Sequence, residues 1–162
     1  MPFTQDMNKN SFAMIREIKS VHNQILAHDL PLLDQLTTLV LRNAADDQSE
    51  LREIRFLFVK LLSMLSAHIQ REGKLVYPTL LRHEVDAAPI SLAVEHVADS
   101  LKEHDQIMDV LRQLRQATNN YRPDYRSSSE VKLTYEKLQS LEKATIELIH
   151  FENTQAYEGY TA

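Results

Sequence analysis

Two side chains with the chemistry of metal ligands interrupt an apolar helical stripe in the segment SAHIQREGKLVYP. His68 and Glu72 are four residues apart, so in an α-helix they lie about 40° apart on one face. The same face carries Leu65 and Leu75. An ionised carboxylate is costly in a protein core unless a donor or a cation pairs with it. The spacing therefore predicts that Glu72 faces a buried partner.

Polar residues interrupt the other apolar stripes in the same way. His104 breaks the third stripe and Glu152 breaks the fourth, while His22 shares a face with isoleucines of the first. Imidazole and carboxylate ligands without sulfur suit Fe, Mn or Zn, and facing helices that carry them are a common way for a bundle to build a di-metal site. The predicted metal ligands are His22, His68, Glu72, His104 and Glu152.

Other readings of these residues remain open. A histidine on an apolar face is often a satisfied core residue, and a glutamate at the end of a bundle is often solvated. A metal-free bundle that acts through protein partners is therefore the alternative function. A ferritin-like oxidase would need Glu-x-x-His pairs on two helices; only Glu147 and His150 form such a pair, off the fourth stripe.

The elements that position these residues are predicted to be helices. The chain has only two Gly and five Pro in 162 residues, too few turn residues for a protein of many short strands. Helical periodicity predicts four amphipathic segments, with Leu32 and Leu75 on their buried faces and interruptions at Pro31 and Pro78. We expect one all-α domain over residues 1–162, an up-down-up-down four-helix bundle with helices at roughly 11–44, 49–83, 89–118 and 128–157. An open helical array is the alternative.

Composition excludes several classes of protein. The formal net charge is −5 with 25% charged residues and no basic stripe, so we expect no nucleic-acid partner. The absence of cysteine excludes disulfides and thiolate metal sites. No signal-like segment and no apolar run of about 18 residues is present, so we expect no membrane partner and a cytoplasmic location.

Three motifs resemble the hemerythrin-like domain of iron–sulfur cluster repair di-iron proteins, a family linked to nitric-oxide and oxidative stress. They are the segments HIQREGKLVYP, KEHDQIMDVLRQLRQATNNYRP and LIHFENTQ. The resemblance covers nearly the whole chain. It implies a bundle with a non-haem di-iron centre, in which Glu72 and Glu152 bridge and His68 and His104 are ligands. On the first helix it points to a histidine before Leu-Pro; we choose His22 over His28.

The resemblance also implies partners. The expected cofactor is iron, as two ions or one, with O2 or NO as the ligand, in a stress response or in iron–sulfur cluster repair. No catalytic residue is predicted, and a binding protein is favoured over an enzyme. Exposed apolar residues such as Phe56 and Val59 would suit a homodimer.

The chain departs from the family pattern at two nitrogen ligands. Leu148 stands four residues before Glu152, where the family has histidine, and His150 points elsewhere on a helix. The segment LRNAADD lacks a further histidine of the first helix, and Gly73 replaces a usual second glutamate. The sequence thus leaves a site with two irons, one, or none.

Overall fold

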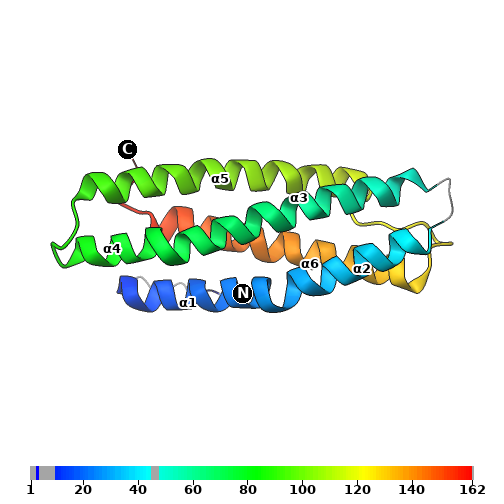
Figure 1. Cartoon of the computed structure of the whole chain (residues 1–162), viewed down its shortest axis with the longest axis horizontal. Coiled ribbons are helices and arrows are strands. Elements are labelled where there is room, and N and C mark those ends of the chain that lie inside the picture. Colours follow the sequence, from blue (N-terminus) through cyan, green and yellow to red (C-terminus); the bar gives the residue numbers. More distant parts are fainter. Residues whose placement is uncertain (1–2, 4–9, 45–47, 162) are drawn as a thin grey trace.

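Four long helical rods run side by side and alternate in direction in the computed structural model (Figure 1). The structure describes residues 3, 10–44 and 48–161; residues 1–2, 4–9, 45–47 and 162, which the predicted domain includes, lie outside the described part. The predicted fold class, an all-α up-down-up-down bundle, is confirmed.

Three of the rods consist of α-helical pieces and a five-residue π-helical segment. The first rod comprises α1 (Ser11–Gln24), η1 (Ile25–Asp29) and α2 (Leu30–Arg42). The second comprises α3 (Ser49–Arg71), η2 (Glu72–Val76) and α4 (Tyr77–Glu84). The third is the uninterrupted α5 (Ile90–Ala117), and the fourth comprises α6 (Ser129–Phe151) and η3 (Glu152–Ala156).

The π-helical segments move the buried face of a rod by one residue. Leu32 and Leu75 were predicted in the core but are 41% and 49% exposed, whereas the following residues, Leu33 and Val76, are buried. A π-helical turn adds one residue to the α-helical repeat, so every position after it rotates relative to a strict 3.6-residue period. The predictions for Leu32 and Leu75 are wrong for this reason.

The same segments let two rods continue through proline. Pro31 and Pro78 are each the second residue of the α-helix that follows a π-helical segment. Proline has no N–H and its ring collides with the carbonyl four residues earlier. In both rods that carbonyl belongs to a residue of the wider π-helical segment, Ala27 or Lys74. The helical rod continues past the proline in both cases (Figure 1).

The packing of the rods forms one apolar core along the bundle. α3 packs against α5 and α2, and α2 also packs against α6. The core includes Phe58, Leu61 and Leu111, which are fully or almost fully buried. None of the helices in the described residues is both long and apolar enough to cross a membrane.

Candidate metal centre

The five predicted ligands meet inside the bundle, where the apolar core is interrupted. Each is buried, and Glu72 and Glu152 have no exposed surface at all. His22 comes from the first rod, and His68 and Glu72 come from the second. His104 comes from the third rod and Glu152 from the fourth.

The carboxylates of Glu72 and Glu152 lie between two groups of imidazoles. On one side, Glu72 Oε1 is 3.2 Å from His68 Nε2, and Glu152 Oε2 is 3.1 Å from His104 Nε2. On the other side, His22 Nε2 is 3.3 Å from Glu72 Oε2 and 3.1 Å from Glu152 Oε1. We call these the two-histidine compartment and the His22 compartment. Each carboxylate thus directs one oxygen into each compartment.

The two-histidine compartment has the donor set of a metal site. One donor atom from each of His68, Glu72, His104 and Glu152 can be chosen so that all lie within 4.8 Å of one another. His68 Nε2 and His104 Nε2 are only 3.1 Å apart. Nitrogen and oxygen donors on one first-row metal ion lie about 2.1 Å from it, so neighbouring donors are separated by about 3 Å.

Both imidazoles of this compartment are oriented by partners on their outer nitrogens. His68 Nδ1 lies 2.6 Å from Glu103 Oε2, and His104 Nδ1 lies 2.8 Å from Asn153 Oδ1. Arg71 in turn donates to Glu103 Oε1 from Nε at 2.8 Å. When each outer nitrogen donates its hydrogen to one of these oxygens, the Nε2 atom of each imidazole faces inward and is free to bind a metal ion. A carboxylate or amide on the outer nitrogen is the usual support of a metal-binding histidine.

The inward-facing atoms fit a cation. Two Nε2 lone pairs at 3.1 Å repel each other unless a proton or a metal ion lies between them. Glu152 Oε2 is buried, and its one close nitrogen among the described residues, His104 Nε2 at 3.1 Å, does not meet hydrogen-bond geometry. A buried polar atom without a partner is costly, and a metal ion in the two-histidine compartment would satisfy both the lone pairs and this oxygen.

Without a metal, protons supply the positive charge. Burial lowers the pKa of His104, but the Glu152 and Glu72 carboxylates outweigh it and raise the pKa to about 10. His22 behaves in the same way, and its pKa rises to about 9. Burial raises the pKa of Glu72, whereas His104 and His22 hold it well below its usual range. The cluster therefore holds an ionised Glu72 and protonated His22 and His104 near neutral pH.

Two tyrosines complete the cluster. The Tyr77 hydroxyl donates to Glu152 Oε1 at 2.7 Å and lies 3.2 Å from Glu72 Oε2, both in the His22 compartment. The Tyr157 hydroxyl donates to Glu72 Oε1, in the two-histidine compartment. Burial and the neighbouring carboxylates raise the pKa of both phenols well above the ordinary value.

The tyrosines occupy equivalent positions in the second and fourth rods. Each follows a glutamate by five residues, and its backbone N–H bonds to that glutamate's carbonyl across a π-helical segment. In an α-helix a residue five positions on would lie about 140° away; the π-helical turn brings it back toward the glutamate. The rods differ four residues earlier, where the second has His68 and the fourth has Leu148.

Other histidines considered from the sequence lie outside the cluster. His28 is in η1 and exposed, whereas His22 is buried in the cluster. His150 is also exposed, and its Glu-x-x-His pair with Glu147 does not reach the interior. Leu148 is 1% exposed and packs as a core residue.

Sequence reasoning did not assign roles to several residues of the site. Glu103 and Asn153 directly neighbour predicted ligands along the chain, but a helix turns adjacent residues about 100° apart, which argues against shared function. Arg71 carried no signal. The available signal for the tyrosines was the repeated five-residue step from glutamate to tyrosine, at Tyr77 and Tyr157.

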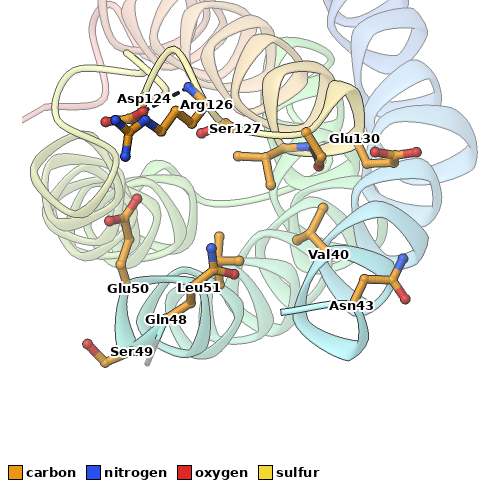
Figure 2. A pocket seen from close by; sticks show the side chains of 12 residues that line it. Val40, Asn43, Gln48, Ser49, Glu50, Leu51, Asp124, Arg126, Ser127 and Glu130 are labelled. Carbon is orange, nitrogen blue, oxygen red and sulfur yellow. Dashed lines mark hydrogen bonds between the residues drawn. The ribbon is translucent and has the colours of Figure 1, made fainter. Parts of the chain in front are cut away.

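A separate pocket opens at the other end of the bundle, where α3 and α6 begin (Figure 2). Its volume is about 590 Å3. Glu50, Asp124 and Glu130 contribute carboxylates and Arg126 contributes a guanidinium, but none of the described residues that line it is a histidine. This pocket lacks the nitrogen donors that make the buried cluster a candidate metal centre.

Comparison with known proteins agrees with this geometry. Residues 13–158 match the family model described as the hemerythrin HHE cation binding domain. The chain is 23% identical over 146 residues to the "Iron-sulfur cluster repair protein ScdA" of two Staphylococcus epidermidis strains, covering 89% of this chain and 64% of each relative. It is 22% identical over 153 residues to the protein of that name from Staphylococcus haemolyticus, covering 92% of this chain and 67% of the relative.

The chain spans about 64% of the length of the two Staphylococcus epidermidis relatives. The family match covers most of the chain and includes all five clustered residues. The chain therefore belongs to the hemerythrin HHE cation-binding domain family.

Proposed function

We propose that the protein binds non-haem iron in the buried cluster, as a pair of ions, one in each compartment. The supporting observation is that Glu72 and Glu152 each direct one oxygen to either side. Such an arrangement suits two cations that share bridging carboxylates, as in di-metal helical bundles. The predicted ligands are His22, His68, Glu72, His104 and Glu152.

The two compartments offer unequal donor sets. The two-histidine compartment has two imidazoles, whereas the His22 compartment has one, because Leu148 provides no nitrogen. Each absent ligand removes binding free energy, so we expect the first ion to occupy the two-histidine compartment. Imidazole and carboxylate donors also accept Mn and Zn; the family resemblance and the named relatives favour iron.

The biological role follows from the same family. We propose that the iron centre serves iron–sulfur cluster repair or the stress response to NO and O2, which are small enough to approach a buried ion. A cavity of about 150 Å3 lies beside His68 and is bordered by Glu103, Gln106 and Ile107. Bound iron would supply the chemistry of gas binding or iron delivery; the protein residues would hold the ion and limit access of water.

Iron content tests this proposal. Wild-type protein purified without oxygen and loaded with ferrous iron should retain iron after desalting, measured by mass spectrometry. His104→Ala should retain less than half as much, because it removes one of two imidazoles from the better compartment. His150→Ala is the matched control, since His150 is exposed on α6. A wild-type protein without iron would favour the metal-free bundle that acts through partners. Equal iron in all three proteins would place the iron at another site.

A further inference from the structure

The His22 compartment contains a fourth oxygen donor that takes the place of a missing imidazole. Its nitrogen and carboxylate donors are His22 Nε2, Glu72 Oε2 and Glu152 Oε1. The Tyr77 hydroxyl lies 2.7 Å from Glu152 Oε1 and 3.2 Å from Glu72 Oε2. We propose that Tyr77 is a metal ligand, and that its phenolate oxygen binds ferric iron in the His22 compartment.

The distances within this compartment support the assignment. The four measured separations between donors run from 2.7 to 3.3 Å. Donors that share one first-row ion are separated by about 3 Å. Tyr77 contacts both carboxylates on the same side as His22, so its oxygen lies where a ligand to an ion between these groups would lie.

The sequence of the fourth rod explains why this compartment needs Tyr77. His68 and Leu148 stand at equivalent positions, each four residues before a bridging glutamate. The two-histidine compartment therefore has a nitrogen from this position, and the His22 compartment does not. An anionic phenolate compensates for the lost imidazole and adds a hard oxygen donor, which favours ferric over ferrous iron.

Tyr157 does not have the same environment. Its hydroxyl contacts one glutamate oxygen, Glu72 Oε1, in the compartment that already has two imidazoles. Its ring stacks on His104 at an interplanar angle of 15°, whereas the Tyr77 ring is tilted by 34° from His22 at the same centroid separation of 6.0 Å. We infer that Tyr157 donates a hydrogen bond to the Glu72 carboxylate and does not bind iron.

Binding of Tyr77 is a proton-for-metal exchange. The phenolic O–H bond breaks, an oxygen–iron bond forms, and the proton leaves to solvent. No electron is transferred when the protein is loaded directly with ferric iron. A nearby cation reverses the preference of a buried group for its neutral form, so the phenol that is a donor in the metal-free protein becomes an anionic ligand.

The test uses the colour of the ferric protein. A phenolate bound to ferric iron absorbs visible light through charge transfer from ligand to metal, and carboxylate and imidazole ligands do not produce this band. Wild type, Tyr77→Phe and Tyr157→Phe would be loaded from ferric nitrilotriacetate, desalted and assayed for iron, visible absorption and resonance Raman scattering. Tyr157→Phe is the matched control, because it removes the same hydroxyl from the equivalent rod position.

We expect the band in wild type and in Tyr157→Phe, and its loss in Tyr77→Phe with about one iron per chain retained. A band that persists in Tyr77→Phe, or disappears in Tyr157→Phe, would overturn the assignment. Because this inference rests on the proposed iron binding, iron content separates the two failures. Iron without the band in wild type refutes only the tyrosine ligand, whereas absence of iron refutes both.

A second measurement requires no variant. Wild-type protein grown with ring-deuterated tyrosine should show isotope-shifted phenolate modes when the Raman spectrum is excited within the band. Unshifted modes would show that no tyrosine binds the iron. The result remains informative if Tyr77→Phe, which changes a fully buried residue, fails to fold.

Discussion

The buried carboxylates of Glu72 and Glu152 depend on the cations and the tyrosine hydroxyls around them. Both side chains are fully buried, and transfer of a carboxylate from water costs several kcal/mol before pairing. Well-packed apolar residues at such positions are often as stable or more stable. The cluster is thus better explained by a binding function than by a contribution to folding.

Glu103 provides a residue-scale prediction. Its carboxylate accepts from His68 Nδ1 and pairs with Arg71, which fixes the His68 ring and its inward lone pair. Glu103→Gln should weaken iron binding by about 10–100-fold, the usual effect of losing such a support. Equilibrium competition against a chelator measures this change.

The control for Glu103 is Asp105→Asn, which removes a charge from an exposed position on the same helix. Its iron affinity should match wild type. Equal weakening in both variants would attribute the effect to net charge rather than to the orientation of His68.

The protonated histidines predict how the stability of the metal-free protein depends on pH. The pKa of His22 is about 9 and that of His104 about 10, compared with 6.5 when unfolded. The folded protein therefore holds these protons more tightly. The stabilisation is complete below pH 6.5 and is lost as the pH rises through 9 to 10.

Urea unfolding of the metal-free protein should show this loss. The free energy of unfolding should fall by several kcal/mol between pH 6.5 and 10, because each unit of raised pKa contributes about 1.4 kcal/mol. A variant with both His22→Leu and His104→Leu should show a smaller fall. A rise in stability over this range would contradict the assigned protonation.

At the scale of elements, the π-helical segments position the site. η2 and η3 begin at Glu72 and Glu152, the predicted bridging residues, and η1 begins three residues after His22. In the second and fourth rods, they also bring a tyrosine onto the face of the glutamate. π-Helical turns are rare and are frequently found at functional sites, which agrees with their location here.

The two glycines give an element-scale prediction. Gly73 lies in η2 with ordinary helical backbone, and an added Cβ would meet nothing within 4 Å. Gly73→Ala should raise the free energy of unfolding by about 0.4–1 kcal/mol, because alanine loses less backbone entropy on folding. Urea unfolding measures this, and iron content should not change.

Gly159→Ala is the contrasting variant. Gly159 also has open space around it, but its φ is 85°, in the region that disfavours residues with a Cβ. We expect this variant to be less stable by about 1 kcal/mol. Equal effects of both substitutions would show that backbone conformation does not determine the outcome.

At the scale of the whole molecule, a pair of ions, one in each compartment, would connect all four rods. The predicted ligands come from α1, the α3–η2 junction, α5 and the α6–η3 junction, which are distant in the sequence. Only the folded bundle brings them together. Binding to the folded state alone raises stability by mass action.

Thermal unfolding tests this coupling. Iron at about 100 times its dissociation constant should add about 2.7 kcal/mol, which corresponds to a rise in melting temperature of about 5–10 °C in a protein of this size. His150→Ala should show the same rise and His104→Ala a smaller one. A similar rise in His104→Ala would place the stabilising iron elsewhere.

The sequence alone determined the bundle and the polar residues inside it. Few turn residues and 3.6-residue periodicity specify long amphipathic helices, and His68, Glu72, His104 and Glu152 are visible because they break apolar stripes. These features are local. A residue within one helix reveals its own face without knowledge of the partner helices.

Only the tertiary structure decided how these faces meet. Leu32 and Leu75 were predicted to be buried but are exposed, because an extra residue in each π-helical segment changes the helical period. Which face of the rod is then buried depends on packing and on the proline that the segment accommodates. The division of Glu72 and Glu152 between two compartments, and the approach of Tyr77 to both, join atoms from separate rods. Such contacts depend on the relative rotation of whole helices, which no local spacing encodes.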